Sequence, residues 1–347
     1  MTTSNLPATQ TAIIQHENGV LKITHGLPIQ DLAPHQMLVK TAAVALNPCD
    51  FKMPLRFPTA GLWDGCDFAG TVVALGSEAA AQGLFRVGDL VFGAVQGSNL
   101  SDPMSGAYCE YVRTEPSLAF RVPKGMALAD APSISGTAIA TLGVALFWSL
   151  QLPGTFEVPA AKAEDVLVYG GSSTIGLLAI QMVKLCGHRV ITTYLVFDYN
   201  SPTCAEDIRA ATKNVLRFVL DPFAEAKTVR LCHAAIGRTG GRYCALEQYQ
   251  ESLCTRKTVK HELVMGGAIS GQGVQLPEPY GIAPRPEIGV WARTWYRKVQ
   301  ELIDEGKIRP CPMQVLTGRF EGILKGLDLL RNGQVSGKKL VVPMGDS

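Results

Sequence analysis

A glycine-rich turn between a strand and a helix is the segment of this sequence best suited to binding a phosphate. The stretch Val166–Val183 reads VLVYGGSSTIGLLAIQMV, an apolar strand followed by the turn and an apolar helix. Backbone N–H groups at such a turn, with the positive end of the helix, can hold a pyrophosphate. Gly171, Ser173 and Gly176 occupy the three positions of the GxGxxG fingerprint, and Ser at the middle one is expected to hinder backbone approach slightly. The sequence predicts a dinucleotide site here; the alternative is a helix packed on a strand without a ligand.

The cysteines and histidines are not spaced for metal binding or for a disulfide framework. Nine cysteines and six histidines are scattered along the chain without a CxxC or an HExxH motif. Zinc needs three or four converging N or S ligands, and we expect that no such set can be assembled. The odd cysteine number and the lack of a signal-peptide pattern indicate a reducing, intracellular compartment, so a cytoplasmic protein is expected.

Composition and charge exclude several classes of protein. Of the 347 residues, 47% are hydrophobic and 18% are charged, which excludes a disordered chain. The net charge is +2 and no basic run exceeds two residues, so no nucleic-acid surface is predicted. Residues 131–156 carry no charge and are long enough to span a bilayer. Their Ser, Thr, Gly and Pro content favours a buried helix followed by a loop over a membrane span.

The elements that must position these residues change in type near residue 129. Before it, short apolar or β-branched runs separated by Gly, Pro and Asn predict strands of a β module, at 12–15, 20–24, 37–46, 68–75 and 90–92. After it, strand–helix alternation predicts a parallel, doubly wound sheet. Its expected strands are 166–169, 189–193, 218–220, 242–246 and 263–265, with a helix at 176–186. A proline-rich loop at 275–287 precedes helices at 291–304 and 320–331 and a strand at 338–342.

Motifs throughout the chain resemble the medium-chain dehydrogenase/reductase superfamily. They keep their order, and they are GCDFAGTVVALG at 65–76, RVGDLVFG at 86–93, GAYCEYV at 106–112, GRTGGRY at 237–243 and SGKKLVV at 336–342. The resemblance implies an α/β protein with two domains. A GroES-like β-rich catalytic domain is expected over 1–130 with 275–347, and a Rossmann dinucleotide-binding domain over 131–274.

The positions that bind zinc in alcohol dehydrogenases of this superfamily are altered. The early Cys and His ligands fall at Asn47 and Cys66, and Cys49 is two residues out of register. The four-Cys structural lobe is also absent. The resemblance therefore implies a zinc-free, quinone-reductase-like branch with no metal.

Within that branch the chain resembles the fungal trans-acting enoyl reductases of polyketide synthases, of the lovastatin enoyl reductase type. The resembling stretches are ALNPCDFKM, ISGTAIATL, VLVYGGSSTIG, AAIGRTGGRY, TRKTVKHELVMGGAISGQG and GQVSGKKLVV. The family reduces an α,β-unsaturated acyl thioester on the acyl carrier protein of a polyketide or hybrid polyketide/nonribosomal peptide synthase, in secondary metabolism. The resemblance implies NADPH as cofactor, the megasynthase as partner, and a monomer with no nucleic acid or membrane to bind.

The resemblance also implies site residues. Those expected at the cofactor are Cys49, Asp50, Phe51 and Lys52 on the nicotinamide side, and Ser172, Ser173, Thr174 and Ile175 at the pyrophosphate. Tyr199, Leu246 and Glu247 are expected to line the adenosine or nicotinamide pocket, and Ser336 and Gly337 to make a last cofactor contact. Those expected at the substrate are Ala138, Ile139, Ala140, Thr141, Leu142, Gly143, Val144, Ala145, Gly266, Gly267, Ala268, Ile269 and Ser270. For the small apolar ones, core packing is an equal alternative.

Lys52 and Thr137 are the candidate catalytic donors. Enoyl reduction builds enolate charge on the thioester oxygen, and a donor aimed there lowers the barrier. No His–acid or Tyr–Lys pair is evident, so the proton would come from water or from one of these two residues. The alternatives are a surface lysine for Lys52 and a hydroxyl bonded to its own helix for Thr137. Asp67 and Asp89 are expected to be structural and turn residues.

One segment departs from the family pattern. About 14 residues, enough for the crossover that two parallel strands require, are missing between the strand ending at Thr193 and the segment beginning at Val196. The missing loop grips the adenosine 2′-phosphate in the family, and Asp198 is read as part of the next strand rather than an NAD selector. We expect weak selectivity for NADPH unless Arg189 or Arg242 binds the phosphate.

The departure keeps other functions open. Either the segment folds differently, or the chain is a damaged version. The alternatives to the enoyl reductase are a free-standing quinone or alkenal reductase, and a catalytically impaired partner of the synthase.

Overall fold

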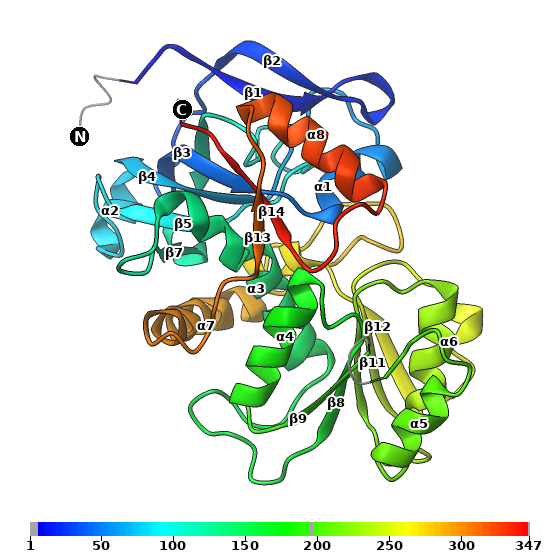
Figure 1. Ribbon diagram of the computed structural model, residues 1–347. Coiled ribbons are helices and arrows are strands. Elements are labelled where there is room, and N and C mark those ends of the chain that lie inside the picture. Colours follow the sequence, from blue (N-terminus) through cyan, green and yellow to red (C-terminus); the bar gives the residue numbers. More distant parts are fainter. Residues whose placement is uncertain (1–5, 194–196, 346–347) are drawn as a thin grey trace. The chain divides into compact units, whose positions relative to one another are not determined.

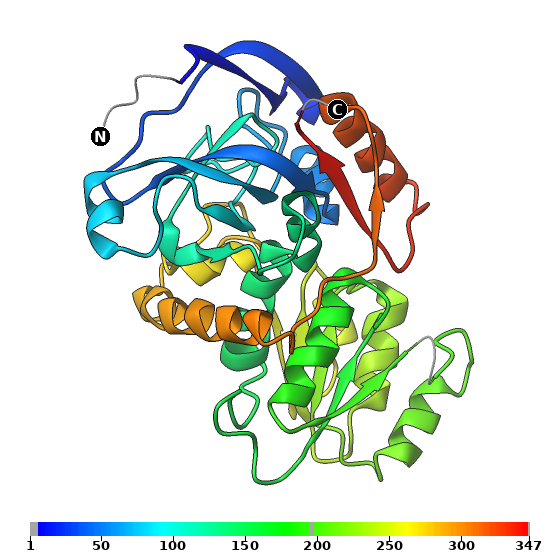
Figure 2. The ribbon, with the colours of Figure 1, turned by 60° about the vertical axis from the view of Figure 1, so that its left-hand side comes forward.

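The computed structural model describes residues 6–193 and 197–345, which form two compact units (Figures 1 and 2). One unit contains residues 1–137 and 292–347, and the other contains residues 138–291. Both boundaries lie later in the chain than the expected 130/131 and 274/275. The reason is that helices α3 (Gly136–Gly143) and α7 (Pro286–Asp304) each run through a boundary.

The first unit is built on antiparallel strands. A hairpin of β1 (Thr9–Gln15) and β2 (Leu21–Pro28) accompanies a larger sheet in the order β13-β14-β3-β4-β5-β7, with β6 also paired to β3. The strands of this sheet are β3 (Met37–Ala45), β4 (Asp67–Leu75), β5 (Leu90–Ala94), β6 (Tyr111–Thr114), β7 (Ala119–Arg121), β13 (Met313–Val315) and β14 (Lys339–Pro343). The strands predicted in this part of the chain are therefore confirmed.

Helices cover this sheet and contribute to its core. They are α1 (Pro48–Arg56), α2 (Ser77–Gln82) and α8 (Arg319–Arg331). Helix α8 packs on β14 and α1, where Phe320, Ile323 and Leu327 join a buried cluster with Leu340. Gly326 permits this approach, because a Cβ there would lie 2.6 Å from a methyl carbon of Leu46. The packing fixes the position of β14, which carries Lys339.

The second unit is a parallel sheet with helices, as the sequence predicts. Its strand order is β12-β11-β10-β8-β9, and every neighbouring pair is parallel. The strands are β8 (Asp165–Val168), β9 (Arg189–Thr192), β10 (Phe218–Asp221), β11 (Gly241–Ala245) and β12 (Val259–Leu263), and the helices are α4 (Thr174–Leu185), α5 (Cys204–Ala211) and α6 (Ala226–Ala235).

Strand β12 is the one that the sequence misplaces. It was expected at 263–265, but it begins at Val259 and ends at Leu263. It lies at the edge of the sheet, where Lys260, His261 and Glu262 are exposed. An edge strand does not need an apolar run, so its sequence does not read as a strand of a buried parallel sheet.

The shortened connection leaves the sheet continuous. Among the described residues, β9 is the edge strand, and the chain passes from it through α5 to β10 on the far side of β8. Residues 194–196 of the connection lie outside the described residues, and Thr193 and Phe197 form an isolated parallel bridge. A helix and an outermost strand can be removed from such a sheet without separating any of the remaining strands. The described residues on both sides of the connection thus belong to a continuous sheet.

The apolar stretch is helical and mostly buried. Among the described residues, the helical run Leu128–Ser149 is the one long and apolar enough to cross a membrane, and 83% of its most apolar window is buried in the protein. Ser135 interrupts it with a φ of 61°. Such burial is typical of a core helix, as the sequence predicts.

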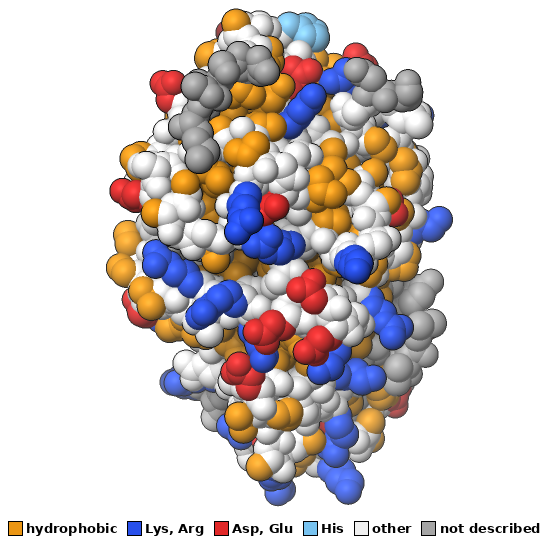
Figure 3. Space-filling model, turned by 90° about the vertical axis from the view of Figure 1, so that its left-hand side faces the viewer, with side chains coloured by type: hydrophobic (Ala, Val, Ile, Leu, Met, Phe, Trp, Pro, Cys, Tyr) orange, Lys and Arg blue, Asp and Glu red, His pale blue; other side chains and the backbone are white. Residues whose placement is uncertain are grey.

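Figure 3 shows acidic and basic side chains together on one face, so that face has no single-sign charge.

Candidate active site

The turn between β8 and α4 is closed by hydrogen bonds of a serine side chain. The Ser173 hydroxyl donates to the Gly170 carbonyl at 2.8 Å and accepts from the Gly176 N–H at 3.1 Å, so Ser173 is the N-cap of α4. The cap satisfies one of the N–H groups that a helix start leaves unpaired. The side chain at the middle fingerprint position therefore turns back into the loop. The hindrance expected from a serine here is replaced by a capping role.

The two fingerprint glycines are required by close contacts within the unit. A Cβ at Gly171 would lie 2.0 Å from Thr192 Oγ1 of β9, and a Cβ at Gly176 would lie 2.4 Å from the Gly170 carbonyl oxygen. Gly170 itself has a φ of 66°, in the left-handed region that favours glycine. The loop is thus a backbone cradle at a helix start, and it fits a dinucleotide pyrophosphate. The expected contact residues Ser172, Thr174 and Ile175 are partly exposed there.

Asp221 organises the next loop at the same carboxyl edge of the parallel sheet. Its buried carboxylate accepts from the N–H groups of Phe223 and Ala224 at 3.0 Å, from the Thr228 hydroxyl at 2.6 Å and from the Tyr243 hydroxyl at 2.9 Å. These bonds fix the first turn of α6. Sequence reasoning did not single out Asp221, although an acid that ends a buried strand was a visible signal.

Tyr199 lies beside a lysine that the sequence did not point to. Its ring centroid is 6.1 Å from that of Tyr169, which follows β8 directly. The Lys227 ammonium, on the first turn of α6, lies 5.4 Å from the Tyr199 ring and 3.0 Å from the Asn200 side-chain oxygen. The structure thus places an exposed cation beside the residue expected at the adenosine.

The two arginines considered for the 2′-phosphate lie at the opposite, amino edge of the sheet. Arg189 begins β9 and binds the Asp165 carboxylate at 2.8 and 3.0 Å. Arg242, at the start of β11, donates to the Ser149 carbonyl at 3.1 Å and to Gln151. Because all the strands are parallel, neither arginine lies at the edge that carries the glycine-rich turn. The suggestion that one of them binds the phosphate is therefore wrong.

Leu246 and Glu247 follow β11 at the carboxyl edge. The Leu246 N–H donates to the Asp221 carbonyl at 3.1 Å. The Glu247 carboxylate accepts from the Tyr280 hydroxyl and, at 2.9 Å, from the Gln248 N–H. Both residues are partly buried and stand on the expected side of the sheet.

The two segments expected at the substrate are neighbours. Residues 138–145 lie on α3 and the following π-helix, Val144–Ser149, and residues 266–270 form a 3₁₀ turn. A Cβ at Gly266 would lie 2.4 Å from Thr141 Oγ1, so the segments touch. Side chains 138–145 are all buried, as are Ala268 and Ile269. Their packing is that of a core, and a role at the substrate stays a prediction.

In the first unit, the start of α1 is held by a buried carboxylate. Asp50 is 2% exposed; its carboxylate accepts from the Asn47 N–H at 2.7 Å, which completes a capping box, and from the Tyr108 hydroxyl at 2.5 Å. Burial raises the pKa of Asp50, although these donors lower it. Phe51 packs against the core, whereas Cys49 and Lys52 are partly exposed. Within the segment expected at the nicotinamide, Cys49 and Lys52 therefore keep part of their surface accessible.

Asp67 is the centre of a second buried network. Its Oδ2 accepts from the Lys339 ammonium at 2.8 Å, the Ser135 hydroxyl at 2.8 Å and the Asn47 amide at 3.1 Å. Its Oδ1 accepts from the Thr137 N–H at 2.8 Å and the Thr137 hydroxyl at 2.7 Å. A structural role for Asp67 is as expected. The Thr137 proton is committed to Asp67, and this arrangement does not support Thr137 as a donor to substrate.

The surroundings of three further expected residues, Asp89, Ser336 and Gly337, say less about their roles. Asp89 accepts from the Arg86 N–H at 2.9 Å and from Arg121 at 3.2 Å, as expected of a turn acid. Ser336 is exposed and Gly337 has a φ of 66° in the turn before β14. Lys339, two residues on, was missed; a lysine at the head of the apolar run LVVP was the available signal.

Comparison with known proteins identifies the family. The alcohol dehydrogenase GroES-like domain family matches residues 33–124. The chain is 50% identical over 358 residues to an enoyl reductase of Chaetomium globosum, covering 98% of this chain and 95% of the relative. It is 49% identical over 358 residues to a trans-enoyl reductase of Aspergillus flavipes, covering 99% and 98%. The chain belongs to the fungal trans-enoyl reductases.

Another relative has the same length at the shortened connection. A trans-enoyl reductase of Phaeosphaeria nodorum is 47% identical over 342 residues, covering 99% of this chain and 97% of the relative. An alignment no longer than the part of the chain it covers leaves no room for an inserted segment after Thr193. A second trans-enoyl reductase thus lacks an insertion there, which argues against a damaged chain.

Solved structures show the same fold at low identity. The CurK enoyl reductase superposes with a TM-score of 0.71 at 17% identity, covering 97% of this chain and 99% of that one. A mycobacterial protein solved in complex with NADPH gives 0.72 at 19% identity, covering 96% and 99%. These neighbours place the enoyl reductase in the medium-chain dehydrogenase/reductase fold, an α/β fold with a GroES-like and a Rossmann domain.

Three potential metal ligands do converge in this reductase. One ligand atom each of Cys49, Asp50 and Cys66 lies within 4.8 Å of the others, a group of two sulfurs and one oxygen that falls short of the three N or S ligands considered from the sequence. The Asp50 carboxylate is already bound by Tyr108 and Asn47. The hydrogen bond with Cys49 and burial raise the pKa of Cys66 well above its ordinary value. The pKa of Cys49 is lowered by the Cys66 thiol, but burial and Asp50 leave it raised overall. Zinc binds thiolates, so these protonated thiols fit it poorly.

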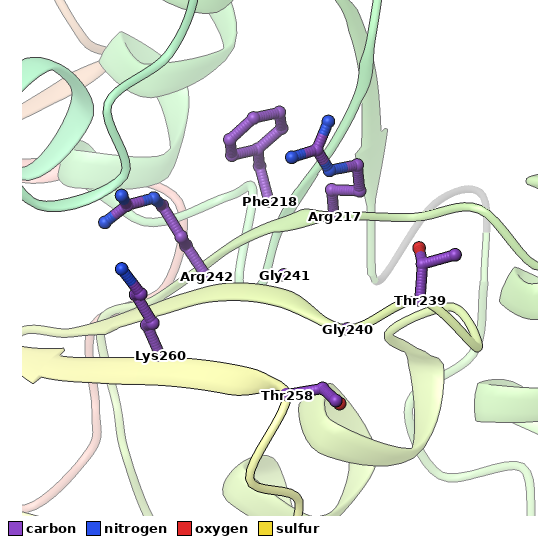
Figure 4. A pocket seen from close by; sticks show the side chains of 8 residues that line it. All are labelled: Arg217, Phe218, Thr239, Gly240, Gly241, Arg242, Thr258 and Lys260. Atoms are coloured by element: carbon purple, nitrogen blue, oxygen red, sulfur yellow. The ribbon is translucent and has the colours of Figure 1, made fainter.

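A basic pocket in the second unit lies away from the glycine-rich turn. About 490 Å³ in volume, it lies at the amino ends of β10, β11 and β12, with Arg217, Arg242 and Lys260 around Gly240 and Gly241 (Figure 4). The glycine-rich turn stands at the carboxyl ends of the same parallel strands. In this enoyl reductase the pocket therefore belongs to the opposite edge of the sheet.

Proposed function

We propose that this enzyme uses NADPH to reduce the C=C bond of an α,β-unsaturated acyl thioester carried on the acyl carrier protein of a polyketide or hybrid polyketide/nonribosomal peptide synthase. The observation that carries the proposal is the full-length similarity to relatives named trans-enoyl reductases. The intact glycine-rich turn supports it, because a chain that had lost its cofactor would not need that loop. The enzyme acts as a cytoplasmic monomer on a substrate presented by the synthase.

The turn supplies the common part of cofactor binding. A bound nicotinamide supplies the hydride, which is chemistry that no side chain of the protein can provide. The Gly170–Thr174 loop and the start of α4 hold the pyrophosphate through backbone groups. Tyr199 and Lys227 provide the adenosine end, and the lysine ammonium binds the 2′-phosphate by a charge-assisted hydrogen bond. A structural neighbour solved with NADPH supports this choice of cofactor.

Lys52 is the remaining candidate for the catalytic donor. It lies on α1, partly exposed, beyond a first turn that the Asn47–Asp50 capping box and Tyr108 hold in place. A donor on a fixed turn can be aimed at the thioester oxygen as enolate charge develops there. The single proton that the reaction needs, taken up by the carbon next to the carbonyl, then comes from water or from Lys52 itself.

A single-turnover assay tests the proposal. The reduced enzyme is mixed with NADPH and an enoyl thioester on the cognate carrier protein, and the saturated product is measured by mass. Reduction of the carrier-bound chain, faster than that of free quinones or alkenals, supports the trans-enoyl reductase. Reduction of free quinones alone would contradict it and favour the quinone reductase.

An impaired partner of the synthase is the second candidate, favoured by the short connection after Thr193. Fluorescence titration with NADPH separates it from both enzymes. Binding with turnover supports the enzyme. Failure to bind any nicotinamide nucleotide, by a protein that still binds the synthase, would show that the chain is a non-catalytic partner.

A further inference from the structure

Two cysteines from separate elements of the first unit place their sulfur atoms in contact. Cys49 is the second residue of α1, and Cys66 directly precedes β4. Their Sγ atoms are 3.9 Å apart, although the residues are 17 positions apart in sequence. Both cysteines are reduced and both are partly exposed.

The surrounding contacts hold both cysteines in place. Cys49 is next to Asp50, whose carboxylate is bound by Asn47 and Tyr108. Cys66 is next to Asp67, which is fully buried and accepts from Lys339 and three other residues. Each cysteine therefore precedes a buried aspartate whose hydrogen bonds hold the backbone in place. The contact is a property of the packed unit rather than of a loose surface.

Most other cysteines offer no such opportunity. Cys109, Cys186, Cys204, Cys232, Cys244 and Cys311 are buried. Cys254 is the remaining partly exposed cysteine, and it belongs to the second unit. Oxidants in solution therefore reach three cysteines first, and two of these three are already in contact.

We propose that Cys49 and Cys66 are a modification site: they are oxidised to an intramolecular disulfide that slows the reductase. With glutathione disulfide as oxidant, the thiolate of one cysteine displaces a glutathione thiolate and forms a mixed disulfide. The second cysteine gives its proton to solvent, and its thiolate displaces the second glutathione. One glutathione disulfide is reduced to two glutathiones, and two thiols become one disulfide.

The effect on the enzyme follows from the position of Cys49. The disulfide bond is about 2.0 Å long, so the two sulfurs, now 3.9 Å apart, must approach each other, and we expect this approach to shift the first turn of α1. That turn leads directly to Lys52, the candidate donor, one turn further along the same helix. Oxidation therefore displaces Lys52, and reduction restores it. This consequence, unlike the disulfide itself, rests on the proposed function.

The test uses the full chain. Reduced protein is incubated with glutathione disulfide at neutral pH, free thiols are alkylated, and tryptic peptides are mapped by mass. We expect one species in which the Cys49 and Cys66 peptides are linked, with turnover at least about fivefold lower and restored by dithiothreitol. Cys254→Ser, which removes the third partly exposed thiol, should form the same link. Cys66→Ser should remain active in the presence of the oxidant.

Distinct results overturn each part. Cys49 and Cys66 found separately alkylated or separately glutathionylated, with no linked peptide, would remove the modification site, and the map of the wild-type protein decides this even if Cys66→Ser does not fold. A linked peptide with unchanged turnover would remove the effect on activity. If the reduced protein never reduces an enoyl thioester, the proposed function fails, whereas the peptide map still decides the disulfide.

Discussion

The glycine-rich turn of the second unit and the Asp67 network of the first differ in what completes their hydrogen bonding. In the turn, Ser173 caps α4, the Thr193 hydroxyl accepts from the Gly170 N–H, and a Cβ at Gly171 would meet Thr192. The Asp67 network is filled from within by Lys339, Ser135, Thr137 and Asn47. We therefore interpret the turn as the proposed ligand site, and the network, which includes the altered zinc position Asn47, as structural.

Removing the cation of the Asp67 network should have the largest effect. Lys339 and Asp67 are 3% and 0% exposed, and their ion pair is 2.8 Å long. Lys339→Met leaves a buried carboxylate without its cation, and breaking a buried pair costs about 3–5 kcal/mol. We expect the free energy of unfolding in urea to fall by that amount. Lys338→Met, at the exposed neighbouring position, is the matched control. Equal effects of the two variants would show that the network is not structural.

A methyl group in the turn should act on binding instead. Gly171→Ala places a Cβ 2.0 Å from Thr192 Oγ1, so the loop must move away from β9. We expect NADPH to bind at least about a hundredfold more weakly, which corresponds to about 2.7 kcal/mol. Adding Thr192→Ala, which removes the hydroxyl that clashes, should recover part of the affinity. Fluorescence titration measures both, and unchanged affinity in Gly171→Ala would mean that the pyrophosphate binds elsewhere.

Replacing Lys52 should slow the chemical step without changing the glycine-rich turn or the Asp67 network. The Lys52→Ser variant should lower single-turnover rates at least about tenfold, because a donor that acts mainly in the transition state contributes at least that much. NADPH affinity and the melting temperature should change little. Unchanged turnover with a native melting curve would remove Lys52 from the mechanism. It would leave solvent as the proton source.

The sequence predicts the parts of this molecule that depend on local pattern. Strand β8, the turn and α4 are all visible as an apolar run, Gly and Ser residues and a second apolar run. Asp67 and Lys339 are 272 positions apart, and their pairing depends on β14 joining β3, which no local pattern encodes. Lys227 likewise reaches Tyr199 only because Asp221 fixes the start of α6. The Cys49–Cys66 contact depends on two buried carboxylates in the same way.

The preference for NADPH over NADH tests a selectivity that the glycine-rich turn alone cannot provide. In the proposed site the backbone groups of the loop would hold the pyrophosphate, which NADH and NADPH share, so selectivity would come from the adenosine end. Lys227 is an exposed cation, and exposed ion pairs contribute about 0.2–1 kcal/mol. We therefore expect NADPH to bind less than about tenfold more tightly than NADH.

Two changes separate the lysine from the missing loop. Lys227→Gln should bring the two dissociation constants close to equality, whereas Arg230→Gln, one turn along α6 and also exposed, should not. Inserting the family's loop and helix after Thr193 should raise the preference. A preference above a hundredfold in the unaltered chain, or one that survives Lys227→Gln, would assign the phosphate to another group.

A chelator should have the smallest effect, and it tests whether Cys49, Asp50 and Cys66 bind a metal ion. Cys49, Asp50 and Cys66 converge, but a metal would have to displace Tyr108 from Asp50 and remove protons from two thiols of raised pKa. The Lys339 ammonium already supplies a positive charge to Asp67 nearby. We expect less than stoichiometric zinc by elemental analysis and full turnover after treatment with EDTA. Stoichiometric zinc that protects Cys49 and Cys66 from alkylation would show that the three side chains are a ligand set. This region of the first unit would then be a ligand site, as we propose for the turn.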